Sequence, residues 1–154
     1  CPSPFDSYLM TLGLETLSLR VRHEVESARR LAEYCRNHPK VERVSFVGFE
    51  SHPSYANAKK YFRFGSSAVF TIELKGTLDS TVRFVESLNL AAHMVMIGDS
   101  VTVVTHPAST THKQLSDADL AAAGVTPTML RISVGLENTD DLIDDFEQAF
   151  AHIG

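Results

Sequence analysis

The longest regular pattern of apolar residues runs from Phe5 to about Asn37. Apolar side chains recur there at steps of three and four residues, which predicts a helix with one continuous apolar face. That face consists of Leu14, Leu17, Val21, Val25, Ala28, Ala32 and Cys35. Gly13 interrupts the pattern, and we expect a bend or a separate first turn there. The residues before Gly13 are apolar on more than one side, so this end of the helix needs a partner, either beyond this domain or within it.

Shorter apolar runs, several of them alternating with polar residues, predict the strands of a sheet. They cover residues 41–47, 68–74, 91–97, 100–105 and 130–137. Helical patterns cover residues 55–61, 77–88, 116–123 and the C-terminal stretch from residue 139. Ser116 with Asp119 resembles a cap at the start of the third of these helices. The expected inward face of the last helix consists of Leu142, Phe146, Phe150 and Ile153. Strands interleaved with helices, without a hairpin signal, predict a two-layer α+β fold in which helices pack on one face of a single sheet. We expect the last two strands to pair.

Length and composition limit the class of protein. A chain of 154 residues fits one domain, residues 1–154, that can bury a core. A net charge of −5 without a basic face argues against nucleic acid as the main partner. No apolar run approaches the roughly 18 residues of a membrane span, and no signal peptide is visible. Cys1 and Cys35 form no metal or disulfide framework and fit a reducing cytoplasm, while a start at Cys1 instead of Met suggests a fragment or a processed chain.

Arg131 is the first candidate for a binding residue. It lies in the alternating run 130–137, and its rigid guanidinium fork suits a carboxylate held by two parallel hydrogen bonds. One interpretation is that Arg131 faces a ligand. The alternative is an ordinary strand arginine on a solvated face, because surface ion pairs are common and weak. The residue alone leaves both interpretations open.

Two other groups of residues could carry chemistry. His106 and His112 flank Ser109, which permits a nucleophile–base pair or, with an acid, a zinc site. No strained GxSxG turn and no helical histidine spacing supports either, so a loop whose hydroxyls fix the strand exit is the simpler interpretation. Acidic residues also gather in the last helix: Asp140, Asp141, Asp144 and Asp145. They could ligate a hard cation, but complementing the helix dipole explains them better.

Several motifs together resemble one family of enzymes. They are, in chain order, Pro4–Asp6, Gly13–Leu17, Glu50–Pro53, Ala58–Tyr61, His106–His112, Ala122–Val125 and Arg131–Glu137. The last three closely resemble the C-terminal part of the Cys/Met-metabolism enzymes that use pyridoxal phosphate, and the first four resemble the O-acetylhomoserine sulfhydrylase branch. Thr110 also favours that branch, since the lyase and cystathionine-synthesising cousins usually have Met at this position.

The resemblance covers about the last third of such an enzyme. It implies the small C-terminal domain of a fold-type I enzyme, a mainly antiparallel sheet with helices on one side. The large N-terminal domain, which binds pyridoxal phosphate, is missing from this chain. None of the lysines, Lys40, Lys59, Lys60, Lys75 and Lys113, lies in the family's lysine motif. The chain alone is therefore expected to be inactive, and its expected partners are its own N-terminal domain and further copies of the full protein in a tetramer.

The resemblance also implies an activity and a set of substrate-binding residues. The parent enzyme would convert O-acetylhomoserine and sulfide or a thiol to homocysteine or methionine and acetate, with pyridoxal phosphate as electron sink. Arg131 matches the arginine that grips the α-carboxylate. Met96 matches the family's other carboxylate contact, where sulfhydrylases commonly have Asn, so any contact from Met96 would come through its backbone. Val101 matches a pocket position where sulfhydrylases often have Arg, and Thr102 keeps the family's hydroxyl as a wall residue. A cystathionine γ-synthase, a methionine γ-lyase and a non-catalytic binding module remain as alternatives.

Overall fold

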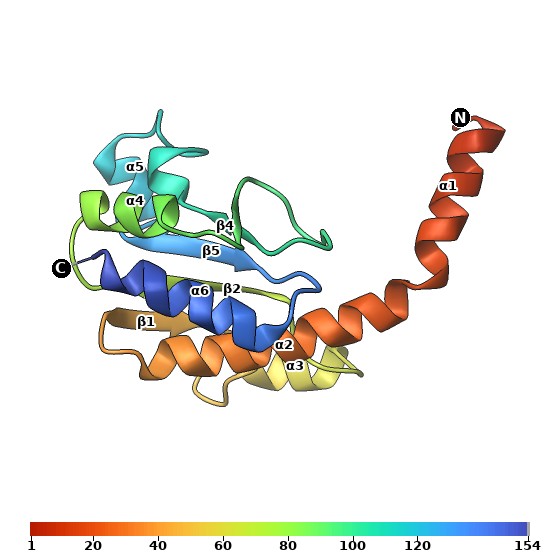
Figure 1. The fold of residues 1–154 in the computed structure, drawn as a ribbon, viewed down its shortest axis with the longest axis horizontal. Helices are drawn as coiled ribbons and strands as arrows, with labels where there is room; N and C mark the ends of the chain where they lie inside the picture. The colour runs from red at the N-terminus through yellow and green to blue at the C-terminus, as the bar shows by residue number, and fades with distance from the viewer. Residues whose placement is uncertain (154) are drawn as a thin grey trace.

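The computed structural model describes residues 1–153, which form a five-stranded sheet and the helices that surround it (Figure 1). The helical segments are α1 (Pro4–Glu15), α2 (Leu17–Asn37), α3 (Tyr55–Tyr61), α4 (Leu78–Glu86), the 3-10 turn η1 (Pro107–Ser109), α5 (Asp117–Ala122) and α6 (Thr139–Ala151). The strands are β1 (Val41–Ser45), β2 (Val69–Leu74), β3 (Ala92–His93), β4 (Val103–Thr105) and β5 (Met129–Ser133). They lie in the order β1-β2-β5-β4-β3, and every pairing except the parallel β3–β4 pair is antiparallel. The expected α+β fold with a mainly antiparallel sheet is confirmed.

Helices α2, α4 and α6 form a layer over one face of the sheet (Figure 1). Each strand turns every second side chain toward that layer, as Ile72 and Leu74 do on β2, and both are buried. Helix α6 adds Phe146 and Phe150, whose ring centroids lie 5.5 and 4.7 Å from that of Phe84 on α4. The core therefore lies between the helices and one face of the sheet.

Helix α1 projects from the rest of the chain and contains no buried residue (Figure 1). The break between the first two helices lies at Thr16 and not at Gly13, where the pattern placed it. Arg20 supplies a physical reason, because its guanidinium donates to the Gly13 carbonyl at 2.9 Å and to the Thr16 hydroxyl. These bonds provide partners at the end of α1, where helical carbonyls would otherwise have none.

The largest departure from the predicted strands lies between residues 91 and 105. Only Ala92–His93 and Val103–Thr105 pair in the sheet, so β3 and β4 are much shorter than the sequence predicted. Residues 94–98, which we call the strap, form a loop although four of them are apolar. A strand needs backbone partners on a neighbouring strand, whereas the strap takes its partners from side chains of β4 and β5.

In the C-terminal third, the observed elements agree more closely with those predicted from the sequence. Strand β5 pairs with β4 as expected, and Thr105 lies opposite Arg131. Helix α5 begins at the predicted cap, where the Ser116 hydroxyl accepts from the Asp119 amide at 3.2 Å. The inward face expected for the last helix is buried, from Leu142 to Ile153. Among the described residues, no helix combines the length and the apolar character that a membrane crossing requires.

Candidate substrate-binding site

Arg131 lies near the middle of the sheet, on the face that the helices do not cover. Its neighbours on β5, Leu130 and Ile132, are fully buried in the core, and the alternation of side chains along a strand turns Arg131 to the opposite face. Its partners on the flanking strands are Thr71 of β2 and Thr105 of β4. The sheet thus holds a half-buried guanidinium among polar side chains on a rigid base.

The guanidinium of Arg131 has hydrogen-bond donors that are not fully satisfied within the chain. Its Nε is buried and has no hydrogen-bond partner. One terminal nitrogen, Nη2, approaches the Thr105 hydroxyl at 3.4 Å and the Met96 carbonyl at 3.5 Å, which are long contacts. An unpartnered buried donor is costly in a protein and calls for an acceptor. A carboxylate is the acceptor whose two oxygens best match the guanidinium fork.

The strap lies against this part of the sheet and is attached to it at three points. The Thr105 hydroxyl donates to the Met94 carbonyl at 2.6 Å, and the Gly98 amide donates to the Ser133 hydroxyl at 3.3 Å. The contact of Arg131 with the Met96 carbonyl lies between these two. The main chain of the strap is therefore fixed beside Arg131, while its apolar side chains are exposed.

The other predicted site residues lie close to the strap in the chain but differ in what they offer. Met96 meets Arg131 through its carbonyl, and its side chain is 47% exposed. Val101 is 41% exposed. Thr102 is fully buried, where its hydroxyl donates to Glu137 at 2.7 Å and accepts from the Gly135 amide at 2.9 Å. Any part that Thr102 plays in binding would come through the backbone that it fixes.

Two residues that the sequence analysis did not assign to this site shape it. Thr105 connects Arg131 to the strap. Asp145 on α6 is buried and accepts from the backbone amides of Asn89, Leu90 and Ala91 at 2.8, 3.0 and 3.0 Å, which fixes the segment leading into β3 and the strap. A signal for Asp145 exists in the sequence, because it falls on the apolar face of α6 and not among the exposed aspartates.

The hydrogen bonds of the serine–histidine pair that the sequence suggested indicate a structural role. His106 Nε2 lies 2.9 Å from the Pro127 carbonyl, so Nε2 carries the hydrogen and Nδ1 accepts from the Ser109 hydroxyl at 2.8 Å. His106 is 1% exposed, and this burial lowers its pKa below the usual value. The two bonds fasten η1 to the segment before β5. Within residues 1–153, no three histidine, cysteine or acidic side chains cluster as metal ligands would.

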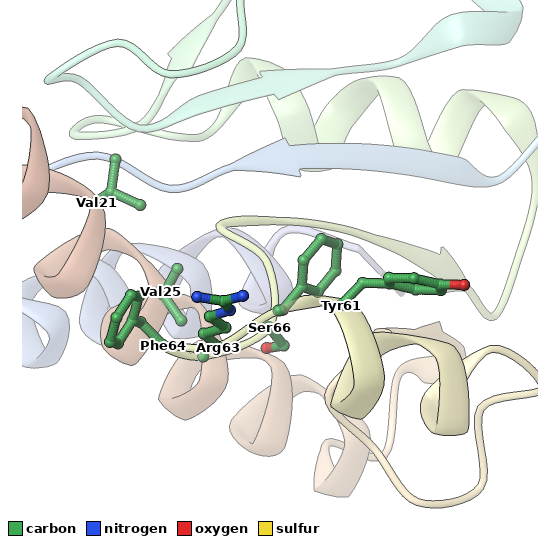
Figure 2. A pocket seen from close by; sticks show the side chains of 8 residues that line it. Val21, Val25, Tyr61, Arg63, Phe64 and Ser66 are labelled. Atoms are coloured by element: carbon green, nitrogen blue, oxygen red, sulfur yellow. The ribbon is translucent and has the colours of Figure 1, made fainter.

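Hollows on the chain lie elsewhere. Figure 2 shows one of about 360 Å³ between α2 and the loop after α3, lined by Val21, Val25 and residues 61–66. Its walls are mostly aliphatic and aromatic, with Arg63 as the charged member. A second hollow of about 430 Å³ lies beside it and shares Val21 and Phe64. Neither brings together the acid, base or nucleophile that a catalytic centre needs.

The sequence matches the family of Cys/Met metabolism PLP-dependent enzymes over residues 1–151. That match covers nearly the whole chain. The chain belongs to this family. Homocysteine synthase of Schizosaccharomyces pombe is 46% identical over 96% of the chain and 34% of its own length. O-acetyl-L-homoserine sulfhydrylase 1 of Thermus thermophilus is 43% identical over 96% of the chain and 35% of its own length.

Solved structures agree with the sequence match. A crystal structure of a putative O-acetylhomoserine (thiol)-lyase from Campylobacter jejuni superposes with a TM-score of 0.88 at 36% identity, covering 96% of this chain and 35% of that one. That structure contains a pyridoxyl-lysine phosphate at its position 205. This chain therefore spans about a third of the length of the relatives it matches.

The lysines of this chain do not fit the cofactor of the family. A lysine that bonds covalently to a carbonyl cofactor must be activated, usually by desolvation or a neighbouring cation. Here Lys40 donates to the Phe150 carbonyl at 2.7 Å, and Lys75 donates to the Pro39 carbonyl at 2.9 Å. The others, Lys59, Lys60 and Lys113, are exposed. Among the residues that the structure describes, no lysine amine is therefore placed to hold pyridoxal phosphate.

Proposed function

We propose that this chain is the small C-terminal domain, residues 1–154, of a sulfhydrylase that converts O-acetylhomoserine and sulfide or a thiol to homocysteine or methionine and acetate. Pyridoxal phosphate would be held by a larger N-terminal domain of the same protein, and the full-length protein would assemble with further copies of itself. Support comes from relatives named homocysteine synthase and O-acetyl-L-homoserine sulfhydrylase, which are about three times as long as the part they share with this chain.

One observation carries the substrate-binding role of the chain. Arg131 presents a buried, unpartnered Nε and two long contacts from Nη2 on an open sheet face. An amino-acid α-carboxylate would complete these donors with two parallel hydrogen bonds. Because both the guanidinium and the carboxylate are planar, such a pair fixes the direction in which the rest of the substrate points. The reacting carbon would thereby be held in one place, and such orientation lowers the barrier to reaction.

The proposed reaction exchanges one bond at the substrate's γ carbon. The Cγ–O bond breaks and acetate leaves with the bonding electrons, while sulfur forms a Cγ–S bond and loses its proton to the medium. Arg131 is remote from this exchange and does not donate a proton to it. The backbone of Met96 and the side chain of Val101 are proposed to lie near the substrate, with Thr102 as a positioning residue behind them.

Substitution of Arg131 in the full-length enzyme tests the role of the guanidinium. Arg131→Ala should reduce kcat/KM for O-acetylhomoserine by about 2–4 kcal/mol of transition-state stabilisation, mostly through KM. The KM for sulfide should stay unchanged because sulfide has no carboxylate. Arg43→Ala is the matched control, since Arg43 lies on the same face of the sheet but donates to Glu73. Equal effects of the two substitutions would refute a special role for Arg131.

A second experiment tests the division of labour and the reaction class. The visible absorbance of lysine-bound cofactor should appear when pyridoxal phosphate is added to the full-length protein and not when it is added to residues 1–154 alone. A stoichiometric band in the short chain would contradict the proposal. Sulfide-dependent release of acetate from O-acetylhomoserine would separate a sulfhydrylase from a methionine γ-lyase or a cystathionine γ-synthase. Absence of any turnover would favour a non-catalytic binding module.

A further inference from the structure

One continuous stretch of chain, residues 131–137, carries both the guanidinium of the site and the anchors of the loop beside it. The Gly98 amide, at the end of the strap, donates to the Ser133 hydroxyl at 3.3 Å. Two residues further along the loop, the Ser100 carbonyl accepts from the Leu136 amide at 2.8 Å. The loop is therefore held in place by the same piece of backbone that holds the guanidinium.

The carboxylate of Glu137 is the strongest of these anchors. Its two oxygens both accept from Thr102, one from the backbone amide at 2.6 Å and the other from the hydroxyl at 2.7 Å. The Thr102 hydroxyl in turn accepts from the Gly135 amide at 2.9 Å. Hydrogen bonds to a carboxylate are shorter and roughly twice as strong as those between neutral groups. Thr102 is fully buried, and no other group among residues 1–153 accepts from its amide.

The two segments approach each other backbone to backbone. A Cβ atom at Gly135 would lie 2.5 Å from the Ser100 carbonyl oxygen and 2.6 Å from the Thr102 nitrogen, so no side chain separates them. Val101 lies between Ser100 and Thr102, and both of these neighbours are bonded to the stretch 131–137. The backbone of Val101 is therefore fixed on both sides, while its side chain is exposed.

We propose that Glu137 is a positioning residue for substrate binding, which acts through Thr102 on residues 98–102 and so sets the place of the strap beside Arg131. This inference rests on the proposed function, because it assumes that Arg131 binds the α-carboxylate of the substrate. Glu137 does not bind the substrate itself, since both of its oxygens accept from Thr102. Support of this kind holds a binding group within about 0.5 Å of its productive geometry.

Glu73 on β2 provides a matched comparison. It is also a half-buried glutamate whose carboxylate is bonded within the chain, to Arg43 Nε at 2.9 Å. Its partner lies on β1, at the edge of the sheet opposite to β3 and the strap. If Glu137 served only the stability of the fold, Glu137→Ala and Glu73→Ala would have the same effect on substrate binding.

The first test compares these variants in the full-length enzyme loaded with its cofactor. Glu137→Ala should raise KM for O-acetylhomoserine about tenfold, the lower end of what a hydrogen bond to a charged group contributes, with kcat and the KM for sulfide within about twofold. The dissociation constant of norvaline, an amino acid without a leaving group, should rise by the same factor in calorimetry. Glu137→Gln should stay within about threefold, because its amide keeps one oxygen for Thr102. Glu73→Ala should leave these values within about twofold, and equal effects of Glu137→Ala and Glu73→Ala would overturn the proposal.

A double-mutant cycle tests whether Thr102 transmits the effect. Thr102→Val removes the hydroxyl and its bond to Glu137, so it should weaken norvaline binding in the same direction as Glu137→Ala. Because the two substitutions break the same link, the double variant should bind norvaline no more weakly than Glu137→Ala alone. Effects that multiply in the double variant would overturn the proposed route through Thr102.

The binding measurement separates this inference from the proposed function. If the enzyme binds norvaline through Arg131 but does not consume O-acetylhomoserine, the proposed reaction fails, and the effect of Glu137→Ala on binding still decides the positioning role. If Arg131→Ala leaves norvaline binding unchanged, the proposed role of Arg131 fails and this inference fails with it. If Glu137→Ala lowers the free energy of unfolding without weakening norvaline binding, the positioning role alone is overturned.

Discussion

Thr105 lies directly opposite Arg131 in the β4–β5 ladder, and its hydroxyl links the arginine to the strap. The Thr105 hydroxyl donates to the Met94 carbonyl at 2.6 Å and lies 3.4 Å from Arg131 Nη2 as an acceptor. One side chain thus aligns the guanidinium and fixes the loop beside it. Arg131 would be of less use for orientation without this link, because a single arginine side chain has several rotatable bonds.

Removal of this link should weaken substrate binding without unfolding the chain. Thr105→Val keeps the shape of the side chain but loses both contacts of the hydroxyl. In the full-length enzyme we expect KM for the amino-acid substrate to rise about five- to tenfold, the cost of one hydrogen bond, with little change in kcat. Thr71→Val is the control, because Thr71 is the partner of Arg131 on the other flanking strand. Steady-state kinetics of both variants would check this, and an equal change in both would contradict it.

Asp145 should matter more for stability than any other aspartate of α6. Asp145→Ala leaves the amides of Asn89, Leu90 and Ala91 without their acceptor, and we expect the free energy of unfolding to fall by about 2–4 kcal/mol. The adjacent Asp144 is exposed, so Asp144→Ala should change the free energy of unfolding by less than about 0.5 kcal/mol. Urea denaturation of the two variants measures the difference, and similar midpoints would refute the anchoring role.

Gly135 and Gly13 should respond in opposite ways to alanine. A Cβ atom at Gly135 would lie 2.5 Å from the Ser100 carbonyl oxygen and 2.6 Å from the Thr102 nitrogen, so Gly135→Ala must displace backbone. We expect a loss of about 3 kcal/mol in the free energy of unfolding. A Cβ at Gly13 meets nothing within 4 Å, and alanine favours the helix by up to about 1 kcal/mol. Circular dichroism during thermal unfolding reports both effects, and a stable Gly135→Ala would show that β4 and β5 can separate at this point.

Acid should destabilise the chain in part through His106. Burial lowers the pKa of His106 in the folded chain, so the unfolded chain binds the proton more readily. The stability that the neutral imidazole provides is complete above about pH 6.5, the unfolded value, and is lost as the pH falls toward the lower folded value. Stability measured from pH 7.5 to 5 should therefore decline less steeply in His106→Gln than in the original chain. If stability falls with pH at the same slope in both chains, protonation of His106 does not contribute to the acid destabilisation.

Burial also lowers the pKa of His38, so its protonation also destabilises the folded chain in acid. His38 is present in both chains, so the difference between their pH–stability curves reports on His106 alone.

The sequence predicted the elements whose own pattern decides their structure. The inward face of α6, the cap of α5 and the pairing of β4 with β5 all follow from local periodicity and turn chemistry. Arg131 was placed on a strand correctly because the run around it alternates strictly. The family resemblance, carried by motifs along the whole chain, was confirmed by the match over residues 1–151.

Contacts between distant residues account for what the sequence did not predict. The run 91–97 has the composition of a strand, but only Ala92 and His93 find a partner, and that partner lies beyond the strap in the sequence. The local pattern groups Asp145 with the exposed aspartates of α6, because the backbone amides that donate to it lie more than fifty residues upstream. Such pairings depend on the tertiary fold, and the local pattern does not identify the partner.

The way in which the strap is attached has a consequence for the divergence of this surface. Its three attachments use the Met94 and Met96 carbonyls and the Gly98 amide, while the side chains that hold them belong to the sheet. Main-chain atoms are common to all amino acids, so residues 94–97 can mutate without loss of these bonds. The side chains of the strap can then change over generations by single substitutions, while the folded scaffold and the placement of the Arg131 guanidinium are inherited unchanged.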